Sequence, residues 1–288
     1  MDLEQCAPRA GNSDKTHASL PRSKQRPETG SIGILFNGQS THSTSDPELA
    51  KSTFCKLFPP DEKYRLQMRR ELGNSFLAVD VNCSGRLVAV KEYKWRNSED
   101  NLRLLKTSHT NIVNLLDAFL VEDVFHFVYE LMEVSLKELA SSVKLEENHI
   151  SFVCKEILHG LQYIHRVLNV SYSGRIDCEN IFLDRQGAVK IADIGPQLLE
   201  GDPSMEQYDV RSVGFIMKET MEPENTEFNL SLSNPGIWSD ALRDFLQKTQ
   251  WSCTCLLLQH VFLSYATSRV FMAAAVFMAR DLVLHDYE

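Results

Sequence analysis

The chain has 288 residues, of which 43% are hydrophobic and 24% are charged, values ordinary for a globular protein of one large or two smaller domains. The net charge is −9, and residues 1–60 carry seven Lys/Arg against six Asp/Glu, which leaves the rest of the chain at −10. So acidic a folded part argues against nucleic acid as a partner.

The seven cysteines are scattered and form no C-x-x-C pair, and the polar, acidic N-terminus does not resemble a secretory leader. Both features favour an intracellular location, in the cytoplasm or the nucleus, where thiols stay reduced. Cys253, Cys255 and His260 are close enough in sequence to raise the alternative of a metal site. Three candidate ligands fall short of the usual four, so we favour buried thiols.

Residues 1–59 are rich in Ser, Thr, Pro and charge, and we interpret them as a disordered N-terminal tail. Extended patterns follow in the expected strand-rich part, residues 60–132. Its predicted elements are strands at 76–80 and 87–91 joined by a turn at 82–85, a short helix at 98–107, and two further strands ending near Met132.

Helical periodicity dominates the expected second part, residues 133–263. Apolar residues recur at helical spacing from Ile150 to Ile164, with further predicted helices at about 209–221 and 239–248. Strands followed by helices predict an α+β fold with two lobes, a small strand-rich N-lobe and a helical C-lobe.

A C-terminal tail, residues 264–288, contains the ten-residue apolar run Val270–Ala279 between Arg269 and Arg280. Ten residues are too few to span a bilayer, so no transmembrane segment is expected. We predict a helix that packs on the domain or on a partner, with contact to a membrane surface as the alternative.

The sequence from Gly187 to Gly195 predicts a strand that ends in an Asp-X-Gly turn at Asp193, and Asn180 precedes it in a neighbouring strand region. In a phosphoryl-transfer enzyme, an Asn and an Asp so placed would hold Mg²⁺ between nucleotide phosphates. These two residues are the candidate metal ligands.

Several motifs, in the same order along the chain, resemble those of the eukaryotic protein kinases. The sequences NIVNLLDAF and LLLQHVFL resemble the sterile-twenty group of serine/threonine kinases most closely. The interval of 13 residues between Asn180 and Asp193 also matches that family. The matching stretches are Val88–Lys91, His109–Val113, Cys178–Leu183, Val189–Gly195, Asp209–Gly214, Leu242–Leu246 and Leu256–Leu263.

The resemblance implies ATP and Mg²⁺ as cofactors and a role for each matching residue. Lys91 would contact the α/β-phosphates, and Asn180 and Asp193 would bind Mg²⁺. The other implied contacts are the hinge at Glu130 to Met132, the adenine sandwich of Ala89 and Phe182, and a bulky gatekeeper at Tyr129.

The catalytic machinery departs from the family pattern. Arg175 stands where the resemblance places the catalytic Asp, and arginine stays protonated and cannot act as a base. Asp177, two residues on, is a possible substitute, but phosphoryl transfer tolerates little displacement of its groups. Asp209, which in the family holds the catalytic loop by hydrogen bonds, is retained.

The fold also looks truncated in three places. Only Gly73 remains of the glycine-rich loop that covers phosphates. Asp100, or Glu99 beside it, follows Lys91 too closely to be an ordinary partner for that lysine. Only 13 residues separate Gly195 from Asp209, so no A-P-E segment exists to dock a peptide substrate.

Three functions remain open from the sequence. The first is a catalytically inactive pseudokinase that binds or scaffolds a protein partner, for example an active kinase, with weak ATP binding at most. The second is an active serine/threonine kinase with Asp177 as the relocated base. The third is a truncated or mis-spliced product without function, because missing coding segments would shorten all three regions together.

Overall fold

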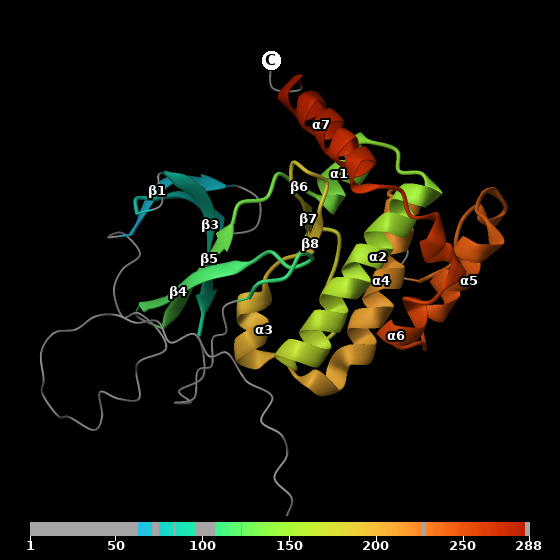
Figure 1. The fold of residues 1–288 in the computed structure, drawn as a ribbon, viewed down its shortest axis with the longest axis horizontal. Helices are drawn as coiled ribbons and strands as arrows, with labels where there is room; N and C mark the ends of the chain where they lie inside the picture. The colour runs from blue at the N-terminus through green and yellow to red at the C-terminus, as the bar shows by residue number, and fades with distance from the viewer. Residues whose placement is uncertain are drawn as a thin grey trace, which may run out of the picture. The chain divides into compact units, whose positions relative to one another are not determined.

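The structure is a computed structural model that describes residues 63–70, 75–82, 85–95, 107–121, 123–225 and 229–285. The predicted tail at 1–59, Gly73, Glu99, Asp100 and most of the predicted helix at 98–107 lie outside these residues. Within them, a five-stranded sheet forms an N-lobe and a bundle of helices forms a C-lobe (Figure 1), so the α+β prediction is confirmed.

The N-lobe sheet is antiparallel throughout, with the strand order β1-β2-β3-β5-β4. All four predicted strands are present, because alternating apolar side chains give each strand one face to bury. The strands are β1 (Tyr64–Arg70), β2 (Ser75–Asp80), β3 (Arg86–Lys94), β4 (Leu115–Val121) and β5 (Val124–Glu130).

The strand β5 contributes to two separate cores. Its residues Phe125, Phe127 and Tyr129 belong to the large core that continues into the helical lobe. Val128, on the opposite face, belongs to a small cluster inside the sheet together with residues such as Val88. Alternation of side chains across a strand produces this division.

A second, three-stranded antiparallel sheet connects the lobes, in the order β6 (Val134–Ser135), β7 (Ile181–Leu183) and β8 (Val189–Ile191). It places the residues that follow β8 beside the N-lobe sheet. The backbone N–H of Val113 donates to the carbonyl of Ile191 at 2.8 Å, which ties the end of β8 to the segment before β4.

The C-lobe is built around α2 (Glu147–Tyr163), which continues as the π-helix η3 (Ile164–Leu168) and packs against α4 (Glu206–Met221). The inward residues at helical spacing are at most 1% exposed, and they are Ile150, Val153, Cys154, Ile157, Leu161, Ile164, Val210, Val213 and Met217. The remaining C-lobe elements are α1 (Leu136–Ser142), α3 (Ile194–Glu200), η4 (Pro203–Met205), η5 (Pro235–Ile237), α5 (Asp240–Lys248), α6 (Thr254–Leu257), η6 (Val261–Tyr265) and α7 (Arg269–His285).

The turn predicted after Asp193 is wrong. Asp193 adopts a left-handed conformation with φ 59° and ψ 36°, and helix α3 begins at the next residue. Ile194 is fully buried, so the chain enters a helix that packs against the domain and does not form an exposed turn. The seven-residue helix therefore fills part of the short interval between Gly195 and Asp209.

None of the helices in the described part of the chain is long and apolar enough to cross a membrane. In the same described residues, no group of three or more His, Cys, Asp or Glu is arranged to hold a metal ion. His260 instead lies 2.8 Å from Asp244 through its Nε2 atom. The cysteines Cys253 and Cys255 are partly exposed rather than buried as the sequence suggested.

Candidate functional site

Lys91 and Asp193 meet between the two lobes, although 102 residues separate them in the chain. Lys91 comes from β3 and Asp193 from the end of β8, and the Lys91 Nζ lies 2.7 Å from the Asp193 Oδ1. Their side chains are 26% and 28% exposed. Each of these charges thus has the other as its partner.

The predicted nucleotide residues gather around one small cavity of about 40 Å³. A water molecule occupies roughly 30 Å³ of liquid, whereas ligand pockets measure about 300–1,000 Å³. The cavity bounded by these residues is therefore much smaller than a usual ligand pocket. Its lining comprises Ser75, Ala89, Lys91, Val113, Tyr129, Glu130, Met132, Phe182, Ala192 and Asp193.

Tyr129 closes the back of this cavity by contacting α3. Its hydroxyl oxygen accepts a hydrogen bond from the backbone N–H of Gly195 at 2.9 Å. A Cβ at Gly195 would lie 2.6 Å from that oxygen and 2.7 Å from Phe127, so only glycine allows this approach. Burial, and next the Asp193 carboxylate, raises the pKa of Tyr129 well above its ordinary value, which keeps the phenol neutral.

Helix α3 is held against the sheet at its far end as well. The Tyr93 hydroxyl, from β3, donates to the Glu200 Oε2 at 2.6 Å. Behind the cavity, the Tyr172 hydroxyl donates to the Ala192 carbonyl at 2.6 Å. These bonds hold residues on both sides of Asp193 in place.

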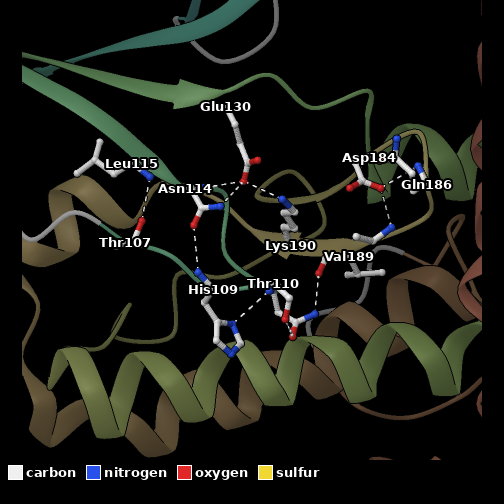
Figure 2. A network of polar contacts seen from close by, with 12 residues as sticks. Thr107, His109, Thr110, Asn114, Leu115, Glu130, Asp184, Gln186, Val189 and Lys190 are labelled. Carbon is white, nitrogen blue, oxygen red and sulfur yellow. Dashed lines mark hydrogen bonds and ion pairs between the residues drawn. The ribbon is translucent and has the colours of Figure 1, made fainter.

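Glu130 does not direct its side chain into the cavity. Its Oε1 accepts from the Asn114 backbone N–H at 2.8 Å, from the Asn114 side chain at 3.0 Å and from the Lys190 Nζ at 2.8 Å (Figure 2). The two charged side chains are only 18% and 11% exposed. Sequence reasoning missed this pair, because it depends on how β8 lies beside the hinge.

The motif at 109–113 forms the other half of the network in Figure 2. The His109 backbone N–H donates to the Asn114 Oδ1 at 3.1 Å, and the Leu115 N–H donates to the Thr107 Oγ1 at 2.9 Å. Burial is the main cause that lowers the pKa of His109. The Asn111 side chain donates to the Val189 carbonyl at 3.1 Å and to the Glu156 Oε2 at 2.7 Å, so the motif is bonded to β8 and α2.

Asn180 lies next to Asp193 in the backbone but not in the cavity lining. Its carbonyl accepts from the Ala192 N–H at 2.8 Å, while its side-chain Oδ1 accepts from the Asp177 N–H at 2.8 Å. Oxygen donors such as these suit Mg²⁺ in kind. With the amide turned to the loop, Asp193 bound to Lys91 and the cavity this small, the residues present do not fit a magnesium nucleotide.

The loop residues Arg175 and Asp177 line a different cavity, of about 540 Å³ against α4. The Arg175 Nε donates to the Tyr172 carbonyl at 3.1 Å. The Asp177 Oδ1 accepts from the backbone N–H groups of Glu179 at 2.9 Å and Asn180 at 3.1 Å, which makes an Asx turn. Asp177 is therefore engaged in its own loop, away from Lys91.

Asp209 organises the same loop from α4. It is fully buried, and it accepts from the backbone N–H groups of Tyr172 and Gly174, both at 2.8 Å. The Nε2 atom of His165 lies 2.9 Å from its Oδ2. The structure thus gives Asp209 the loop-holding role that the motif implies.

Comparison of the sequence with known proteins identifies the family to which this two-lobed fold belongs. The sequence model described as "Protein kinase domain" matches residues 71–216, half of the chain. The chain is 26% identical over 311 residues to the serine/threonine-protein kinase PAK 1 of Mus musculus. That match covers 88% of this chain and 54% of that protein.

Two further relatives are similar over less of the chain. The kinase pakB of Dictyostelium discoideum is 27% identical over 226 residues, 61% of this chain and 26% of that protein. The kinase CST20 of Candida albicans is 30% identical over 154 residues, 50% of this chain and 12% of that protein. The chain thus spans about half or less of these relatives. It belongs to the eukaryotic protein kinase superfamily, in the sterile-twenty-like group.

Proposed function

We propose that this chain is a catalytically inactive, protein-kinase-like domain that works by binding a protein partner. The observation that carries the proposal is Arg175 at the position of the catalytic base. A guanidinium does not accept the proton of a substrate hydroxyl at any physiological pH. The nearest alternative carboxylate, Asp177, already accepts two backbone hydrogen bonds and lines the cavity that does not contain Lys91.

The state of the nucleotide site supports the same proposal. The family generally uses ATP and Mg²⁺, but here the lysine and the aspartate that would contact them neutralise each other at 2.7 Å. A partner protein, for example an active kinase, would then contact the surface of the domain. The relatives are named as serine/threonine kinases, and an intracellular site of action is part of this proposal.

Phosphotransfer is the direct test. Purified full-length protein, incubated with radiolabelled ATP, Mg²⁺ and a basic protein substrate, should incorporate no more label than a reaction without protein. An active sterile-twenty kinase in parallel reports that the assay works. Label incorporation that disappears in Asp193→Ala would contradict the proposal, because that variant removes the carboxylate that is paired with Lys91.

Nucleotide binding is tested separately. A ligand that binds only the native state raises the free energy of unfolding, by about 2.7 kcal/mol at a ligand concentration of 100 times Kd. The melting temperature rises as a result. We expect no change in melting temperature with millimolar ATP and Mg²⁺, in the wild type or in Lys91→Ala. A rise that requires Mg²⁺ and is lost in Lys91→Ala would contradict this expectation and show that the cavity opens to nucleotide.

A further inference from the structure

Helix α7 is a fixed part of the domain on its inner face. It packs against α1 and β6, and Figure 1 shows it beside these elements near the C-terminal end of the chain. The Arg269 guanidinium lies 3.1 Å from the Asp184 carboxylate, and Arg280 lies 2.8 Å from Glu133. The inner side chains that are at most 3% exposed are Met272, Ala275, Val276 and Ala279.

The outer face of α7 is apolar and exposed. Val270 is 75% exposed, Phe271 62%, Phe277 72% and Met278 49%, and Ala274 between them is also exposed. At 3.6 residues per turn these positions form one stripe about 120° wide. Soluble monomers rarely expose large apolar side chains in a continuous group, so this outer stripe indicates a binding surface.

The large apolar residues of the outer stripe are spaced symmetrically about Ala274. Phe271 and Phe277 lie three residues before and after it, and Val270 and Met278 lie four residues before and after it. Val270 and Phe277 share one edge of the stripe, and Phe271 and Met278 share the other. A surface with this symmetry is complementary to itself when a second copy runs antiparallel about a two-fold axis at Ala274.

In that arrangement, Val270 of one copy meets Phe277 of the other, and Phe271 meets Met278. The small side chain of Ala274 lies where the two helices cross, which allows their backbones to approach. A hollow of about 430 Å³ adjoins the same edge as Phe277, and its lining is part apolar, with Ala273 and Val276, and part charged, with Arg185, Arg280 and Asp281.

We infer that the outer stripe of α7 is the interface of a homodimer with two-fold symmetry. A membrane surface suits the stripe less well, because the chain is acidic and anionic lipids would repel it. The dimer does not depend on phosphotransfer or on nucleotide. Failure of the proposed function and failure of this inference are therefore seen in different experiments.

The mass of the full chain in solution tests the inference. Sedimentation equilibrium between about 1 and 100 μM, the range of ordinary specific association, should give twice the 32.8 kDa of one chain. Phe277→Glu should reduce the mass to that of one chain. The control is Val167→Glu in η3, a substitution of another apolar residue that is 64% exposed, which should leave the dimer intact.

Charge pairing tests the antiparallel orientation. Val270→Glu and Phe277→Lys should each be monomeric alone and should form a heterodimer when mixed, because only the antiparallel pair brings positions 270 and 277 together. A wild-type monomer throughout this range overturns the inference, as does a dimer that Phe277→Glu leaves unchanged. A monomer that binds vesicles of neutral phosphatidylcholine overturns it in favour of a lipid surface.

Discussion

Replacing Asp209 with alanine is expected to lower the free energy of unfolding by about 4 kcal/mol, because buried polar groups left without partners cost about 1–3 kcal/mol each. The backbone N–H groups of Tyr172 and Gly174 and the ring of His165 all lose their acceptor together. The total stability of a domain is about 5–15 kcal/mol, so much of it would be lost. Urea denaturation followed by circular dichroism measures the change.

Two variants make this result specific. Asp209→Asn keeps a single acceptor oxygen and should fall between the wild type and Asp209→Ala. Asp202→Ala removes an exposed carboxylate that caps η4 through the Ser204 N–H and should leave the urea midpoint nearly unchanged. An Asp209→Ala midpoint close to that of Asp202→Ala would mean that the loop is held by other contacts.

Replacing Gly187 with alanine is expected to lower the free energy of unfolding by about 3 kcal/mol, from a strained backbone and a steric clash. Gly187 has φ +77°, and a Cβ there would lie 2.5 Å from the Ala273 backbone nitrogen and close to the Arg269 carbonyl, both in α7. Neither backbone atom can move without shifting the helix. Urea denaturation again gives the measurement.

Gly85→Ala provides the matched control. Gly85 has φ +76°, almost the same as Gly187, but a Cβ there would have no neighbour within 4 Å. Its substitution should therefore cost only the backbone strain, about 1 kcal/mol. Equal losses of unfolding free energy in the two variants would show that α7 does not contact the turn at Gly187 closely.

Local patterns in the sequence predicted most of the fold. Alternating residues gave β2 and β3, and apolar spacing gave α2, α4 and α5, because each of these elements buries one face. Helix α3 was not predicted, since Asp193 followed by Gly195 is an ordinary turn pattern. The first turn of this helix is tied to the sheet by the Gly195 N–H, which donates to the hydroxyl of Tyr129, 66 residues earlier in the chain. No local pattern contains that contact.

The candidate site was predicted in composition but not in arrangement. Motif spacing predicted that Lys91 and Asp193 belong to one site, and their side chains lie 2.7 Å apart, but the motif did not indicate the ion pair between them. The direction of the Asn180 amide depends on the loop at Asp177, whose sequence departs from the family pattern. Side-chain direction follows from such neighbours, which a motif does not specify.

The division of β5 between two cores limits how this chain can be cut. Phe125, Phe127 and Tyr129 complete the interior of the helical lobe, although they belong by sequence to the strand-rich lobe. A fragment that starts after β5 would expose the apolar surface that these rings now cover, and isolated lobes would aggregate rather than fold. The two lobes therefore fold as one unit, and a gene rearrangement that separated them would yield two fragments that do not fold alone.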